Sequence, residues 1–150
     1  MNSRKFLSLL LPLIAALTLT ACVQDTASYI LPEKDHAITL MRNQTWLWQD
    51  KVNIDIIPMR LPDCHGGMQI KDVPRSNKLS FFAAPDDYPV PIFILQTGKR
   101  FYAISTLTCE VQKFDEAPAN PGQLLGQFYE KDGKFQFVTS ETMSDKPEKK

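Results

Sequence analysis

Residues 92–114, IFILQTGKRFYAISTLTCEVQKF, decide the fold class. Two arms of apolar and β-branched residues flank Gly98, and their alternation with polar residues is typical of a β-hairpin with a glycine turn. The residues of the second arm that we expect to share the buried face are Phe101, Ala103, Leu107, Cys109 and Val111. Cys109 is therefore expected to point into the core.

The same pattern continues on both sides of this hairpin. Residues 124–140 predict a second hairpin, with its turn at Asp132 and Gly133. Residues 78–84, KLSFFAA, predict a further short strand. The chain thus repeats short strands at close spacing, which is typical of an all-β domain.

Residues 37–61 predict two more strands, paired through a turn near residues 50–51. Trp46 and Trp48 stand at strand spacing and are expected to share a face. The alternation breaks at residues 56–58, where Pro58 cannot donate a hydrogen bond to a central ladder. We therefore expect a β-bulge or an edge at that point.

These segments give about seven or eight short strands and no convincing helix after residue 22. The predicted fold is mostly β: a single small antiparallel β-sandwich or barrel with one disulfide, over residues 37–140. Residues 141–150, ETMSDKPEKK, are expected to form a charged, disordered tail.

The first residues have the features of a targeting segment. Arg4 and Lys5 precede the uncharged run FLSLLLPLIAALTLTA, which is rather short for a membrane span of about 20 residues. The run ends in Leu19-Thr20-Ala21-Cys22, which resembles the lipobox of bacterial lipoproteins.

In that family a diacylglyceryl group is attached to the cysteine sulfur, the leader is removed, and the new amino terminus is usually acylated. The resemblance implies a cleaved helical signal peptide over residues 1–21 and a lipidated Cys22. An uncleaved anchor and an ordinary secretory signal with an incidental cysteine are the alternatives. Two or more acyl chains, such as palmitate, hold a protein stably on a membrane.

The resemblance also implies a location. In lipoproteins of Gram-negative bacteria, an aspartate just after the cysteine usually signals retention in the inner membrane, whereas Val23 and Gln24 follow here. This implies the periplasmic side of the outer membrane. Residues 22–36 are polar and irregular, and we expect them to form a flexible, lipidated tether.

Two cysteines remain, Cys64 and Cys109, and an oxidising compartment favours a disulfide between them. The alternative is a metal site built from both cysteines and His65, which needs reduced thiols and at least one further ligand. We expect the disulfide, no metal and no cofactor.

Charge and motifs narrow the function. Loss of the leader removes Arg4 and Lys5 and leaves about 129 residues, with 15 basic against 17 acidic side chains and a formal charge of −2. That balance argues against a nucleic-acid-binding face, which is basic. His36, His65 and the pair Asp86–Asp87 stand in tether-like or turn-like sequence, so no catalytic residue is assigned.

We therefore expect a non-catalytic binding or structural module that contacts the membrane through its lipid, and envelope proteins or cell-wall polymer through its surface. A small apolar-ligand carrier with a barrel cavity and an envelope hydrolase are the alternatives. Phe81 and Phe82 are adjacent and must point to opposite faces of a strand. Phe82 and Tyr88, beside a proline-rich loop, form the candidate binding face.

Overall fold

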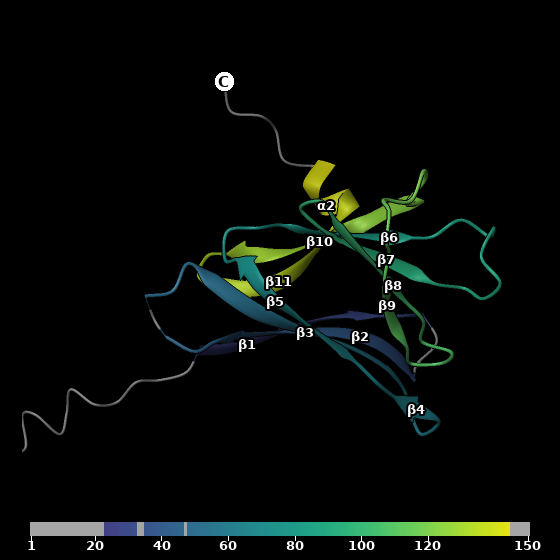
Figure 1. The fold of residues 1–150 in the computed structure, drawn as a ribbon, viewed down its shortest axis with the longest axis horizontal. Helices are drawn as coiled ribbons and strands as arrows, with labels where there is room; N and C mark the ends of the chain where they lie inside the picture. The colour runs from purple at the N-terminus through teal and green to yellow at the C-terminus, as the bar shows by residue number, and fades with distance from the viewer. Residues whose placement is uncertain (1–22, 33–34, 47, 145–150) are drawn as a thin grey trace, which may run out of the picture.

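The computed structural model describes residues 23–32, 35–46 and 48–144 as two antiparallel sheets packed face to face (Figure 1). The mostly-β prediction is confirmed, and of its two forms the sandwich is correct, since the sheets do not close into a barrel. The expected signal peptide, Cys22 and residues 145–150 lie outside the described residues.

The first sheet contains the strands from the N-terminal half of the chain. They are β1 (Val23–Ile30), β2 (His36–Gln44), β3 (Lys51–Arg60), β4 (Cys64–His65) and β5 (Met68–Pro74). β1, β2 and β3 lie in chain order, and both β4 and β5 pair with β3. β1 therefore forms one edge of this sheet.

The second sheet has the order β11-β10-β6-β7-β8-β9. Its strands are β6 (Leu79–Ala83), β7 (Phe93–Thr97), β8 (Arg100–Ile104), β9 (Val111–Lys113), β10 (Gln123–Lys131) and β11 (Lys134–Thr139). A short helix, α2 (Ser140–Ser144), follows β11. The predicted hairpins at Gly98 and at Asp132–Gly133 are both present, as β7–β8 and β10–β11.

The core lies between the two sheets. Strand alternation sends Ile38 and Leu40 of β2 and Ile56 of β3 inward, and each is fully buried. Phe81 of β6 meets them from the other sheet, with its ring 5.2 Å from Tyr29 and 5.7 Å from Phe128 between centroids. Aromatic rings at such distances add to the stability that apolar burial supplies.

The expectation of a flexible tether over residues 22–36 is wrong for residues 23–30, which form β1 and pair with β2 along its length. Ala27 is buried, and the Tyr29 ring lies 5.2 Å from that of Phe137 in β11. An edge strand buries only one face, so its solvent-facing Gln24, Thr26 and Ser28 gave the segment a polar composition.

Two local predictions also fail, and a third holds in part. β2 ends at Gln44, so Trp46 and Trp48 lie in the β2–β3 loop and not in a strand. The irregularity expected at residues 56–58 is present on one side of β3 only: its pairing with β2 runs unbroken past Pro58, whereas on the other side the pairing passes from β5 to β4 between Ile56 and Met59. Residues 141–144, expected to be disordered, belong to α2.

The buried face predicted for the second arm of the β7–β8 hairpin is correct for Cys109 and Val111, which are buried, and wrong for the other three residues. Tyr102 and Ile104 are buried in place of Phe101 and Ala103, and Leu107 is exposed. The cause is a turn over residues 105–110 that interrupts the arm between β8 and β9 and resets the alternation.

Candidate functional site

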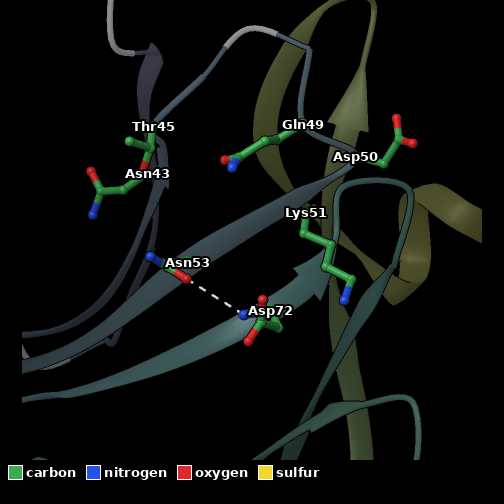
Figure 2. Close-up of a pocket in the computed structure, with 7 residues that line it drawn as sticks. All are labelled: Asn43, Thr45, Gln49, Asp50, Lys51, Asn53 and Asp72. Carbon is green, nitrogen blue, oxygen red and sulfur yellow. Dashed lines mark hydrogen bonds between the residues drawn. The ribbon is translucent and has the colours of Figure 1, made fainter.

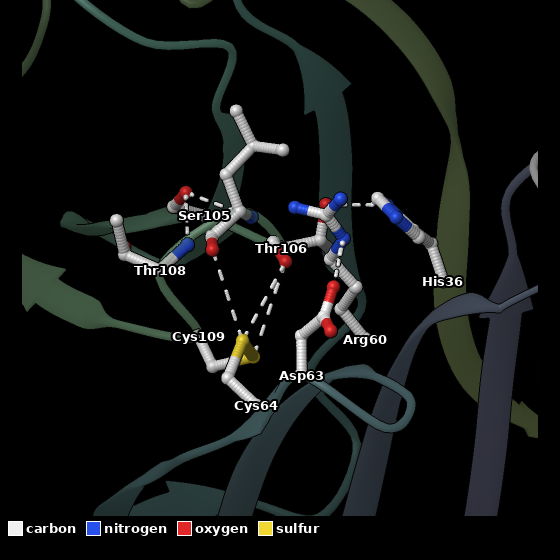
Figure 3. The surroundings of a disulfide bond; sticks show 9 residues. His36, Arg60, Asp63, Cys64, Ser105, Thr106, Thr108 and Cys109 are labelled. Carbon is white, nitrogen blue, oxygen red and sulfur yellow. Dashed lines mark hydrogen bonds and ion pairs between the residues drawn. A yellow bond between two sulfur atoms is a disulfide. The ribbon is translucent and has the colours of Figure 1, made fainter.

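The predicted disulfide is confirmed and joins the two sheets at one end of the sandwich. Cys64 lies in β4 and Cys109 in the turn before β9, with 5.9 Å between their Cα atoms (Figure 3). The Cys64 sulfur packs 3.9 Å from the carbonyl oxygen of Thr106. Because the two sulfurs are bonded to each other, neither is a thiolate ligand, and the alternative metal site with His65 is not formed.

The turn that carries Cys109 is held by its own hydrogen bonds. The Ser105 hydroxyl accepts from the backbone N–H groups of Leu107 and Thr108, at 3.2 and 3.3 Å. Cys109 itself has a φ of 55°, in the left-handed region. Gly66 fits here because a Cβ at that position would meet the Cys109 carbonyl oxygen. The local chain therefore presents Cys109 to Cys64.

Tyr88 lines a surface groove of about 430 Å³ beside the outer face of β8 and β9. Tyr88, Pro89 and Val90 of the loop between β6 and β7 line it, together with Phe114, which follows β9. The rings of Tyr88 and Phe114 meet edge to face, with centroids 6.4 Å apart. The proline-rich loop limits the entropy that a bound partner would have to remove from this part of the groove.

The candidate face of Phe82 and Tyr88 is therefore only partly assembled. Tyr88 lines the groove, but Phe82 does not. Phe82 lies half-buried on the outer face of its sheet, paired with Ile94 and Leu124, while Phe81 is fully buried. The prediction that these neighbours point to opposite faces is confirmed. Phe114 was missed, because nothing local to its sequence indicates the contact with Tyr88.

A second, polar pocket of about 410 Å³ lies by the β2–β3 loop (Figure 2). Its lining includes Asn43, Asn53, Asp50 and Asp72. Asp72 sits at a β-bulge of β5 against β3, with a φ of 56°, and its N–H donates to Asn53 Oδ1 at 3.4 Å. A bulge of this kind redirects a side chain out of the strand alternation.

The histidines and the aspartate pair that were considered for catalysis are not assembled into one site. His36 Nδ1 lies 3.2 Å from Thr106 Oγ1, and His65 is exposed in β4. Asp86 and Asp87 are exposed in the loop that carries Tyr88. Within the described ranges, no cluster of three or more His, Cys, Asp or Glu residues could hold a metal ion.

An ion cluster ties the two sheets together near the polar pocket. Arg42 of β2 is 3% exposed and donates to Asp25 of β1 and to Glu130 of β10, the latter at 2.8 Å. Arg75 donates to the same Glu130 carboxylate at 3.0 Å. The Arg42 guanidinium also lies over the Phe135 ring, 5.0 Å from its centroid. The cluster thus satisfies a buried cation from both sheets.

Arg75, through its hydrogen bond, and Arg42 hold the pKa of Glu130 below its ordinary value of 4.5, against the opposing effect of burial. The stabilisation is present above the unfolded pKa and disappears as the pH falls through the lower folded pKa. We expect Glu130→Gln to lower the free energy of unfolding by about 1–2 kcal/mol at pH 7, since hydrogen bonds to charged groups are worth about that much when partly exposed. Urea titrations at pH 7 and pH 3 should show the difference narrowing in acid.

Glu141→Gln is the matched control, because Glu141 is exposed on α2. Its unfolding should follow the unmodified protein at both pH values. An equal cost of Glu130→Gln at pH 7 and pH 3 would mean that the ionised carboxylate contributes nothing.

Together, the fold and the inter-sheet disulfide define a small, disulfide-linked antiparallel β-sandwich. No protein-family model, no curated protein and no solved structure matches the chain. Over the residues that the structure describes, no helix has the length and apolar character needed to cross a membrane.

Proposed function

We propose that this chain is a lipid-anchored cell-envelope protein on the periplasmic side of the outer membrane, and that its β domain is a non-catalytic binding or structural module. The observation that carries the proposal is the sequence Leu19-Thr20-Ala21-Cys22, which resembles a lipobox, behind a basic start and an uncharged run. The membrane contact is the lipid on Cys22. No cofactor is part of the proposal.

The disulfide supports the choice of compartment. Cys64 and Cys109 are bonded across the two sheets, and such bonds form and persist outside the reducing cytosol.

The Tyr88 groove supports a binding module over the two alternatives. A carrier needs an interior cavity, but the space between the sheets is filled by fully buried side chains such as Leu40 and Phe128. A hydrolase needs convergent catalytic groups, and among the described contacts no hydrogen bond joins His36 or His65 to Asp86 or Asp87. The groove offers an envelope protein or cell-wall polymer a preformed wall.

Cys22→Ser is expected to abolish labelling by a fatty-acid probe and to leave unprocessed precursor, because serine has no sulfur to accept the diacylglyceryl group. Thr26→Ser, a conservative change in β1, should label and process as the unmodified protein does. Normal processing and membrane retention of Cys22→Ser would refute the lipid anchor.

The binding role is tested by cross-linking in intact cells: Tyr88→Ala should lose partners while its melting temperature stays near that of the unmodified protein.

A further inference from the structure

Two exposed tryptophans stand out on the surface. Trp46 and Trp48 lie in the β2–β3 loop, are 44% and 73% exposed, and stack on each other with ring centroids 5.4 Å apart. Tryptophan side chains are highly buried on average in folded proteins, and a cluster of exposed apolar side chains is a candidate contact surface.

Strand pairing places this pair beside the start of β1. β1 and β2 are antiparallel, and Val23 is the partner of Gln44, the last residue of β2. Trp46 follows Gln44 by two residues, and Cys22 is the residue before Val23. Consecutive Cα atoms are about 3.8 Å apart, so Trp46 belongs to the same end of the sandwich as Val23, the residue that is bonded to Cys22.

We propose that Trp46 and Trp48 rest in the headgroup region of the membrane that holds Cys22. This inference rests on the proposed lipid anchor and adds an orientation to it. Tryptophan combines a large apolar ring with a polar N–H group, and it is enriched at membrane–water interfaces for that reason. The acyl chains on Cys22 and the tryptophan pair then both contact the membrane, so the domain is held by two contacts at the same end.

The lack of a spacer strengthens this orientation. Because β1 begins directly after Cys22, no flexible segment lies between Cys22 and the folded domain that could carry the domain away from the membrane. The polar pocket with Asp50 and Asp72 adjoins the same loop, and its groups can bond to headgroups or to their water (Figure 2). A glycan is the competing occupant of this surface, because sugars also stack on tryptophan.

The same geometry points the Tyr88 groove away from the bilayer. Ile30 ends β1 opposite Ala37, seven residues from Val23, which is about 23 Å along an antiparallel strand. Cys64 pairs with Arg60, whose partner across β2 is His36, so the disulfide belongs to this distant end. Figure 1 shows β4 and the β6–β7 loop at the end of the sandwich opposite the β2–β3 loop.

The chain offers its own reporter, because Trp46 and Trp48 are its only two tryptophans. The lipidated protein is reconstituted in phosphatidylethanolamine and phosphatidylglycerol vesicles with or without brominated acyl chains. We expect tryptophan emission to shift to shorter wavelength relative to residues 23–150 expressed without leader or lipid and kept in buffer, and to be quenched by bromines near the headgroup, since interfacial elements lie about 5–10 Å into that boundary. Aqueous acrylamide should quench it less.

The control moves the reporter to the other end. Ile30→Trp in a Trp46→Phe, Trp48→Phe background puts a single tryptophan at a residue that is 71% exposed. Its emission should be quenched by acrylamide and be insensitive to brominated lipid. If the unmodified protein behaves like this control while Cys22 carries a fatty-acid label, the orientation is wrong and the anchor stands. A change in tryptophan emission on addition of soluble peptidoglycan fragments, without quenching by brominated lipid, would assign the surface to a glycan. That result would also overturn the proposed orientation. Absence of the label overturns the anchor itself.

Discussion

Replacing Cys64 and Cys109 together by serine is expected to lower the free energy of unfolding by about 4 kcal/mol. The two cysteines are 45 residues apart in sequence, so the disulfide closes a long loop and restricts the unfolded chain. The folded state should change little, because the turn that carries Cys109 keeps the hydrogen bonds of Ser105. A loss of this size is a large fraction of the stability of a single small domain.

Urea denaturation of the two proteins measures the difference. The unmodified protein in reductant should unfold near the midpoint of the double variant, and the double variant should not respond to reductant. A difference below about 1 kcal/mol would contradict the loop-closure argument and point to residual structure in the unfolded state. If Cys64 and Cys109 are both found as free thiols in protein taken from the envelope, the disulfide itself is contradicted.

The hairpins were predictable because their signals are local. Gly98 and Gly133 adopt left-handed φ values of 59° and 75° at the tips of β7–β8 and β10–β11. Glycine enters this region at no steric cost, and alternation in the flanking arms then sets which side chains are buried. Asp132, with a φ of 53°, completes the second turn as expected for an Asp-Gly pair.

The failures arise where the partner is distant in sequence. Half of the residues of β1 are polar, and its pairing with β2 and the packing of Tyr29 on Phe81 make it a strand. Trp46 and Trp48 have the spacing of a strand, yet β2 ends before them and leaves them exposed. Alternation alone cannot place the end of a strand, because a loop can preserve the same spacing.

The candidate site shows the same division. The disulfide followed from cysteine count and compartment, without knowledge of the fold. The Tyr88 groove needed the structure, because part of its lining comes from Phe114, which lies beyond β9 and contacts Tyr88. The proline-rich loop at residues 85–91 was recognisable in the sequence, but the surface that it faces was not.

Phe81→Ala is expected to lower the free energy of unfolding by about 4 kcal/mol, whereas Phe82→Ala should cost about 1 kcal/mol. Phe81 is fully buried, and its ring contacts those of Tyr29 and Phe93 at centroid distances of 5.2 and 5.3 Å. Truncation there leaves a cavity that links both sheets. Phe82 points to the outer face beside the fully buried Ile94 but is itself only half-buried, so its removal leaves a smaller space that is partly open to solvent.

Thermal and urea unfolding measure the loss of stability in Phe81→Ala and in Phe82→Ala. The two variants are well matched, because both positions are adjacent in β6. If Phe81→Ala does not accumulate as folded protein, Phe81→Leu retains much of the volume and should lose roughly 1–2 kcal/mol. Similar losses for Phe81→Ala and Phe82→Ala would mean that the cover over Ile94 extends across Phe82 and packs it as tightly as the core packs Phe81. In that case the outer face of β6 could not serve as a contact surface, and binding would have to rely on the Tyr88 groove alone.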